Sequence, residues 1–401
     1  MNVKQATLAI FLAVFLGCAR ATSLSLPDLS FLQSPGTIIS VERIAGYNAP
    51  VFKTILVWSP LRDDMRVKCG AVLYRVHYWT TGTDGKPTPV SGLVSLPKQH
   101  EIRGVVAYHH GTLTERRKAP SKPSAEGVLV SAVFAGGGYL TVAPDYIGLG
   151  ASDELHPYIH AESEANAARD LLTAAKAFTR VIGKRWPDSI YLVGFSQGGH
   201  ATMATHRFLE SLNDPHMQVK ASAPVSGVYD LANLTFPTLL AGPTEGDSMY
   251  LAYLYTAYAS NYNQPLSDIV AEPYVDILPT LFDGEHSERS IIDALPRMPR
   301  EMLIPQFLDA YDDGRPTWFL TALAENEVIN WTPKAPVRAY YGERDIDVSP
   351  EEARALVQTF TGRGADAQAI SVGNYDHGGS VMQAIPRARA WFDALSKSNS
   401  P

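Results

Sequence analysis

The sequence predicts an α/β fold in which a mostly parallel sheet carries helices on both faces. Two observations predict it. Short runs rich in β-branched residues alternate with helix-compatible segments, and residues 230–331 break this alternation. Strands that alternate with helices form parallel sheets, because each crossover helix packs back onto the sheet. The interruption is expected to be a helical insertion.

The expected elements follow in chain order. Residues 73–78 and 90–96 alternate apolar and polar side chains, and the turn residues Thr83, Asp84 and Gly85 lie between them, which predicts an antiparallel hairpin. The later elements are strand 103–108, strand 139–143, an Ala-rich helix 162–181, a strand that ends near residue 195 with a helix after it, strand 220–225, strands near 337–341 and 369–372, and a terminal amphipathic helix.

A Gly-x-Ser-x-Gly motif lies where one of these strands meets its helix. Gly194 and Gly198 flank Ser196. A strand-to-helix turn this sharp needs glycine at both positions, because a side chain there collides with its neighbours, and it exposes the serine Oγ to substrate. Ser196 is therefore the predicted nucleophile.

A serine hydroxyl needs an imidazole to take its proton and a carboxylate to orient that imidazole. Asp345 follows strand 337–341, and His377 follows strand 369–372 and is the only histidine C-terminal to Asp345. Proteins with this elbow place the partners in the order Ser, acid, His. We predict Asp345 as the acid and His377 as the base. Asp347 is an alternative acid, and Ser349 or Asp347 is expected to cap the helix that follows.

Two backbone N–H groups are expected to stabilise the oxyanion that forms at the substrate carbonyl. One belongs to Gln197, directly after the nucleophile. The other is expected from the turn after strand 103–108, where His109 and His110 precede Gly111 and Thr112. Thr112 is the predicted donor and Gly111 is the alternative.

Together these motifs resemble the secretory α/β-hydrolase lipases, and among them the secreted cell-wall-degrading lipase/esterases of plant-pathogenic xanthomonads. The matching pieces span most of the chain: His109 to Thr112, Val142 to Gly150, His156 to Tyr158, the serine motif, Gly342 with Asp345, and Asp376 to Gly378. The resemblance implies an α/β-hydrolase fold, hydrolysis of carboxylic esters, the triad Ser196, Asp345 and His377, and a cap over the site that helps to hold a sugar or acyl group.

The N-terminus predicts export. A charged start precedes the apolar run 8–16, which is too short to span a bilayer, and Ala19 to Ala21 forms a cleavage site that would leave Thr22 as the mature terminus. Lipid anchoring through Cys18 is the alternative. Either way Cys69 lacks an intrachain partner, so no disulfide is expected.

These predictions divide the chain into a signal peptide (1–21), a hydrolase core (22–229 and 332–401) and a helical cap or lid (230–331). Tyrosines with largely helical spacing, most of them expected in the cap core, mark the cap: Tyr250, Tyr253, Tyr255, Tyr258, Tyr262 and Tyr274.

The chemistry expected needs no metal or organic cofactor. His109 and His110 point to opposite sides of an extended chain, and Pro157 separates His156 from His160, so neither pair predicts a metal site. The net charge of -7 and the lack of a long basic cluster argue against nucleic acid or an anionic membrane as partner. The oligomeric state stays open.

Two other functions remain open. One is a serine peptidase of the same fold, with acids such as Asp283 to Glu288 as an anchor for a substrate amine. The other is a non-catalytic binding protein on the same scaffold, which the complete triad disfavours.

Overall fold

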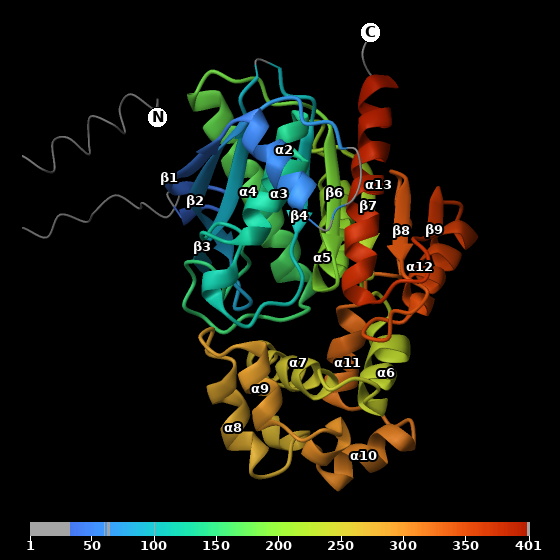
Figure 1. The fold of residues 1–401 in the computed structure, drawn as a ribbon. Helices are drawn as coiled ribbons and strands as arrows, with labels where there is room; N and C mark the ends of the chain where they lie inside the picture. The colour runs from blue at the N-terminus through green and yellow to red at the C-terminus, as the bar shows by residue number, and fades with distance from the viewer. Residues whose placement is uncertain (1–32, 60, 62–64, 100, 399–401) are drawn as a thin grey trace, which may run out of the picture. The chain divides into compact units, whose positions relative to one another are not determined.

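A nine-stranded sheet organises the protein, in the strand order β1-β2-β3-β5-β4-β6-β7-β8-β9 (Figure 1). The computed structural model describes residues 33–59, 61, 65–99 and 101–398. The predicted signal peptide and Cys18 lie outside the described residues. The strands are β1 (Ile38–Tyr47), β2 (Ala71–Thr81), β3 (Pro87–Pro97), β4 (Val105–His109), β5 (Leu140–Pro144), β6 (Ile190–Phe195), β7 (Val219–Val225), β8 (Val337–Tyr341) and β9 (Ala367–Ser371).

The first three strands pair antiparallel, and β3 pairs antiparallel with β5. Every pair from β5 through β4 to β9 is parallel. The predicted α/β class and its opening hairpin are therefore confirmed. Strand β1 was not predicted from the sequence. It lies at the edge of the sheet, and many of its side chains are exposed, so its pattern lacks a clean apolar face.

Helices cover both faces of the sheet. One layer contains α2 (Ala49–Trp58), α3 (Ala125–Val133) and α13 (His377–Ser398), and the other contains α4 (Ala161–Val181), α5 (Gln197–Leu212) and α12 (Pro350–Gly362). Strand β4 shows how the layers form: Val106 and Tyr108 pack with the first layer, whereas Val105 and Ala107 pack with α4 on the other face. Successive strand side chains point to opposite faces, so a strand buried on both sides is apolar throughout.

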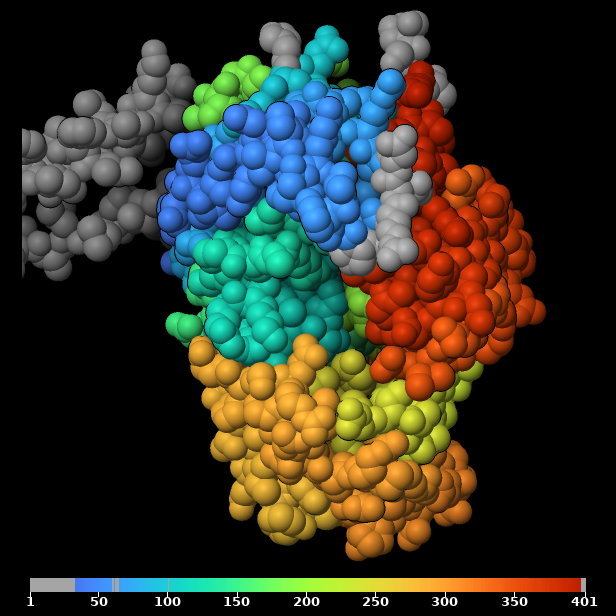
Figure 2. Space-filling model, in the orientation of Figure 1, coloured from blue at the N-terminus to red at the C-terminus, as the bar shows by residue number. Residues whose placement is uncertain are grey.

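Between β7 and β8 the chain forms helices that lie beyond one end of the sheet, shown in yellow and orange in Figure 1. They are α6 (Phe236–Ala241), α7 (Asp247–Asn261), α8 (Tyr274–Leu281), α9 (Glu288–Ala294), α10 (Pro305–Asp312) and α11 (Trp318–Glu325). We call this set the helical insertion. Tyr253, Tyr255 and Tyr258 are buried in its own apolar core, where they pack against other aromatic rings of the insertion such as Phe282 and Phe319. Figure 2 shows the insertion packed below the sheet domain in the same orientation.

Candidate functional site

Ser196 lies in the turn between β6 and α5 with φ 56° and ψ −122°, a conformation that non-glycine residues seldom adopt. The flanking glycines make this turn possible. A Cβ on Gly194 would lie 2.2 Å from the carbonyl oxygen of Gly198, and a Cβ on Gly198 would lie 2.0 Å from that of His109. Both contacts are far too short for real atoms. The chain around Ser196 therefore has the strained strand–turn–helix geometry that the motif predicts.

His377 is the first residue of α13, and its Nδ1 lies 2.8 Å from Oδ2 of Asp345. The other Asp345 oxygen accepts hydrogen bonds from the backbone N–H groups of Asp347 (3.2 Å) and Val348 (2.9 Å). An ionised carboxylate only accepts, so Nδ1 carries the proton and Nε2 is left as the free base. The His377 ring also packs against Phe195, 4.5 Å between centroids, which fixes its position beside the serine.

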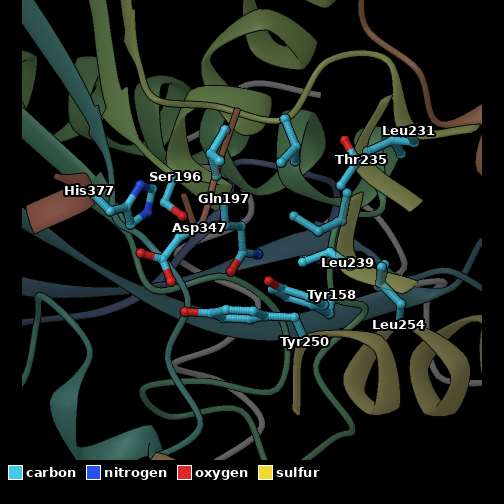
Figure 3. Close-up of a pocket in the computed structure, with 13 residues that line it drawn as sticks. Tyr158, Ser196, Gln197, Leu231, Thr235, Leu239, Tyr250, Leu254, Asp347 and His377 are labelled. Atoms are coloured by element: carbon cyan, nitrogen blue, oxygen red, sulfur yellow. The ribbon is translucent and has the colours of Figure 1, made fainter. Parts of the chain in front are cut away.

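A narrow pocket joins Ser196 and His377 to the helical insertion (Figure 3). In Figure 3 Ser196, His377 and Asp347 stand on one side of the pocket, and Leu231, Leu239 and Leu254 on the other. Its walls are formed by Tyr158, Ile159, Ser196, Gln197, Val228, Leu231, Thr235, Leu239, Tyr250, Leu254, Asp347, Val348 and His377. An apolar wall opposite a nucleophile suits a substrate with one hydrocarbon part.

Buried polar groups bind the side chain of Gln197, the first residue of α5. Its side-chain amide lies 2.9 Å from Oε1 of Glu164 and 2.8 Å from Nε2 of His156. His156 Nδ1 lies 2.7 Å from the carbonyl oxygen of Ile147, so Nδ1 donates there and Nε2 accepts from Gln197. Burial lowers the pKa of His156 to about 4, which keeps its ring neutral in this role.

The Glu164 carboxylate also contacts a second histidine, His200. Glu164 Oε2 lies 2.6 Å from His200 Nδ1, and His200 Nε2 lies 2.8 Å from the carbonyl oxygen of Asn326. Both ring nitrogens of His200 thus face acceptors, so the ring donates on both sides or shares a proton with Glu164. Asn326, directly after α11, also accepts from the first N–H of α4. The end of the helical insertion is thereby tied to the helix that carries Glu164.

The turn expected to supply the second oxyanion donor also lies at the elbow. A Cβ placed on Gly111 would meet Ser196 Cβ at 3.6 Å, so the Gly111 backbone lies beside the nucleophile. The Thr112 hydroxyl is 2.8 Å from the hydroxyl of Tyr158, a pocket residue. The backbone N–H groups of both residues remain candidates for the second donor.

The structure brings most of the predicted residues together. Ser196, Gln197 and His377 line one pocket, and Asp345 lies directly behind His377. The alternative acid, Asp347, lines the pocket itself instead of bonding to the imidazole, and Ser349 caps α12 as expected. The acidic segment from Asp283 to Glu288 does not contribute to the pocket walls.

Sequence reasoning missed Glu164 and His200, and it assigned no pocket role to Tyr158. Glu164 lies inside a long Ala-rich helix, where a charged residue is typical of a solvated face. A signal was nevertheless present, because Glu164 lies on the face of α4 whose other residues are small and apolar. Within the described chain no group of three or more metal-ligating side chains occurs, and no helix is long and apolar enough to cross a membrane.

Comparisons with known proteins agree with this geometry. No family model matches the chain, and no curated protein matches it. Among solved structures, a Legionella pneumophila protein provisionally described as a hydrolase is 27% identical, with a TM-score of 0.85 over 91% of this chain and 99% of that one. The rice cell wall degrading esterase LipA of Xanthomonas oryzae is 23% identical, with a TM-score of 0.79 over 91% and 98%.

Candida antarctica lipase A in its closed state is 15% identical, with a TM-score of 0.71 over 94% of this chain and 85% of that one. These likenesses, together with the mostly parallel sheet and its covering helices, show that the chain has the α/β-hydrolase fold. The resemblance to α/β-hydrolase lipases and esterases, inferred from the sequence motifs, is confirmed.

Proposed function

We propose that this protein hydrolyses carboxylic esters through an acyl intermediate on Ser196. The observation that carries the proposal is the 2.8 Å hydrogen bond from His377 Nδ1 to Asp345. His377 lines the same pocket as Ser196, whose backbone is strained. The esterase and lipase with the same fold support it. A binding protein would have no need of a strained serine beside an oriented imidazole.

The order of steps follows from the unprotonated Nε2 of His377, which can accept the Ser196 proton. His377 Nε2 takes the Ser196 proton as Oγ attacks the ester carbonyl, and Asp345 stabilises the imidazolium that forms. The oxyanion accepts from the Gln197 N–H, at the N-terminus of α5, and from a second N–H in the turn at Gly111 and Thr112. Each well-placed donor lowers the barrier by about 3 to 4 kcal/mol.

Collapse of this intermediate breaks the bond to the alcohol, which takes its proton from His377. Water then attacks the acyl-serine with His377 as base again. The bond between the acyl group and Oγ breaks, Ser196 takes back its proton from His377, and the carboxylic acid leaves. The cycle is complete without a metal or organic cofactor.

The test is hydrolysis of p-nitrophenyl esters by the purified protein, with acyl chains from acetate to palmitate. Ser196→Ala should lose at least about 10³-fold in kcat while its thermal unfolding is unchanged. Activity of Ser196→Ala near that of the wild type would refute the mechanism. A preference for short acyl chains would indicate an esterase, and a preference for long chains a lipase.

We further propose that residues 230–331 act as a cap whose side chains select the substrate. Tyr250 and Leu254 of α7 and Leu239 of α6 form part of the pocket wall, which supports this role. Because the Xanthomonas oryzae relative is a cell-wall-degrading esterase, esters of plant polysaccharides are a substrate class to test. Release of acid from acetylated or feruloylated xylan would support that assignment, and activity confined to lipid esters would oppose it.

A serine peptidase remains the second candidate. The acids from Asp283 to Glu288 do not line the pocket, but Asp347 does, and a carboxylate there suits a substrate amine. Relative rates on an aminoacyl amide and the matching ester separate the two functions. A faster amide reaction would favour the peptidase.

We propose export of the protein with cleavage before Thr22. Mass spectrometry of the extracellular protein checks this, and a diacylated N-terminus at Cys18 would instead establish lipid anchoring.

A further inference from the structure

Asp347 is a carboxylate in the wall of an otherwise largely apolar pocket. It lies in the loop between β8 and α12, where its backbone N–H donates to Asp345 Oδ1 at 3.2 Å. In the described chain no hydrogen bond or ion pair joins its carboxylate to another residue. The side chain is placed by the same turn that places the triad acid, but it is free to meet a ligand.

The surroundings leave this charge poorly compensated. Burial raises the pKa of the Asp347 carboxyl, and nearby Asp345 and Asp376 raise it further, while the interaction with His377 lowers it. On the insertion side, Asp247 and the Tyr250 hydroxyl also interact with Asp347, and both have a raised pKa that burial mainly causes. A half-buried carboxylate in such a field gains most from a cation that brings its own hydrogen-bond donors.

A second, independent observation points to the same ligand chemistry. Both N–H bonds of the Gln197 amide are used by Glu164 and His156, which assigns the remaining atom as Oε1. This oxygen is buried and has no hydrogen-bond partner, in a residue that is 1% exposed and lines the pocket. An unpaired buried acceptor beside a nucleophile fits a substrate N–H or O–H donor.

The positions of these groups narrow the class of substrate. In Figure 3 Asp347 and Gln197 stand near Ser196, whereas Leu231, Leu239 and Leu254 stand on the far side of the pocket. A ligand that satisfies both sides carries its donor group close to the ester carbonyl and its hydrocarbon group farther away. Tyr158 and Tyr250 add aromatic faces, which also favour a cation.

We infer that the pocket binds a primary ammonium group through Asp347 and the Gln197 side-chain oxygen, and that its preferred substrates are α-amino acyl esters with an aliphatic side chain. The ester part of this inference rests on the proposed function. The ammonium site does not, because it can be measured by binding alone.

The kinetic test compares leucine ethyl ester with ethyl 4-methylpentanoate, which lacks only the amine. Asp347→Asn keeps the size of the side chain and removes its charge. It should lower kcat/KM for the leucine ester at least about tenfold more than for 4-methylpentanoate. The intrinsic reactivity of each ester cancels in this comparison, because each is measured on both proteins. Asp276→Asn removes the same charge at an exposed position on α8. It should leave the ratio of the two kcat/KM values, leucine ester to 4-methylpentanoate, unchanged.

An equal loss on both esters would overturn the inference, because Asp347 would then act on His377 and not on the amine. The binding test uses ligand-observed NMR with 3-methylbutylammonium, and 3-methylbutan-1-ol as the neutral control. The ammonium should bind the wild type at least about tenfold more tightly than the alcohol, and Asp347→Asn should abolish the difference.

If the ammonium binds in this way but neither ester is hydrolysed, the site stands and the proposed function fails. If the ammonium and the alcohol bind alike, the inference fails whatever the activity.

Discussion

At the scale of single residues, the site depends on which carboxylate reaches His377. Asp345 and Asp347 are two residues apart at the end of the same strand, and the sequence leaves both possible. The structure places Asp345 against Nδ1 of His377 and Asp347 in the pocket wall. Backbone N–H groups also bond to Asp345, which holds its carboxylate behind the ring. The two carboxylates therefore occupy separate places, one behind the imidazole and one in the pocket wall.

Asp345→Asn should lower kcat by about 10⁴-fold, because an amide N–H that faces Nδ1 would force the proton onto Nε2 and remove the base. Asp347→Asn should cost less than about tenfold on a neutral ester such as p-nitrophenyl butyrate, since it leaves this tautomer intact. Steady-state kinetics on that ester checks both values. The reverse ranking would make Asp347 the triad acid.

At the scale of elements, the elbow depends on close approach of two backbones. Gly198 lies where a Cβ would meet the carbonyl oxygen of His109, so β4 and α5 must part before any side chain fits. Local sequence is enough to predict the turn itself, because a Cβ on Gly194 would meet the carbonyl oxygen of Gly198 within the same motif. The approach of His109 on β4 is a long-range contact that the sequence could not show.

Gly198→Ala should therefore lower the free energy of unfolding by at least about 2 kcal/mol, together with activity. Gly362, the last residue of α12, offers a matched control because a Cβ added there would meet no neighbouring atom within 4 Å. Gly362→Ala should be neutral or add up to about 1 kcal/mol. Urea unfolding of both variants is the measurement, and similar losses would show that the elbow is not under this constraint.

The N-terminal part of α4 stabilises the turn at Ser196 through Glu164. Glu164 accepts from Gln197 and pairs with His200, and all three side chains are buried. Removing the Glu164 carboxylate takes away the acceptor that faces His200 Nδ1, and a buried polar pair that loses one partner is strongly destabilised.

Glu164→Gln should cost about 3 kcal/mol of unfolding free energy and should lower kcat more than it raises KM, because Gln197 loses its anchor. Glu162→Gln, an exposed change on the same turn of α4, should alter neither. Denaturant titration and steady-state kinetics check the pair. A rise in KM alone would mean that Glu164 does not position Gln197.

At the scale of the whole molecule, Glu352 joins the sheet to the helical insertion. Its carboxylate accepts from the N–H groups of Tyr229 and Asp230 after β7, and from the Thr235 hydroxyl before α6. Burial raises the pKa of Glu352 to about 7, despite these three donors. The folded protein thus keeps a proton on Glu352 that the unfolded chain releases near its ordinary pKa.

Because the folded pKa is raised, the stabilisation from this proton is complete below about pH 4.5 and is lost as the pH rises through about 7. Glu352→Gln mimics the protonated form at every pH. The wild type should therefore lose about 3 kcal/mol of unfolding free energy relative to Glu352→Gln between these limits. Urea unfolding across this pH range measures the difference. A constant difference would mean that Glu352 is ionised throughout.

Much of the fold was predictable because strand and helix periodicity are local properties. The hairpin, helix α4, strand β8 and the helix after Ser196 all appear within a few residues of their expected bounds. Helices α2 and α3 were missed. Each is short and only weakly amphipathic, so its place in the layer around Phe52 and Val130 comes from packing and not from a pattern.

By itself, the sequence determined the α/β class, the strained serine turn and the order of Ser196, Asp345 and His377, because steric clash and periodicity act between near neighbours in the chain. Only the tertiary structure decided that Asp345 and not Asp347 meets the imidazole, that Glu164 and His200 support Gln197, and that Asp347 faces the pocket. These arrangements join residues that are far apart in sequence, and their distances depend on how loops and layers pack.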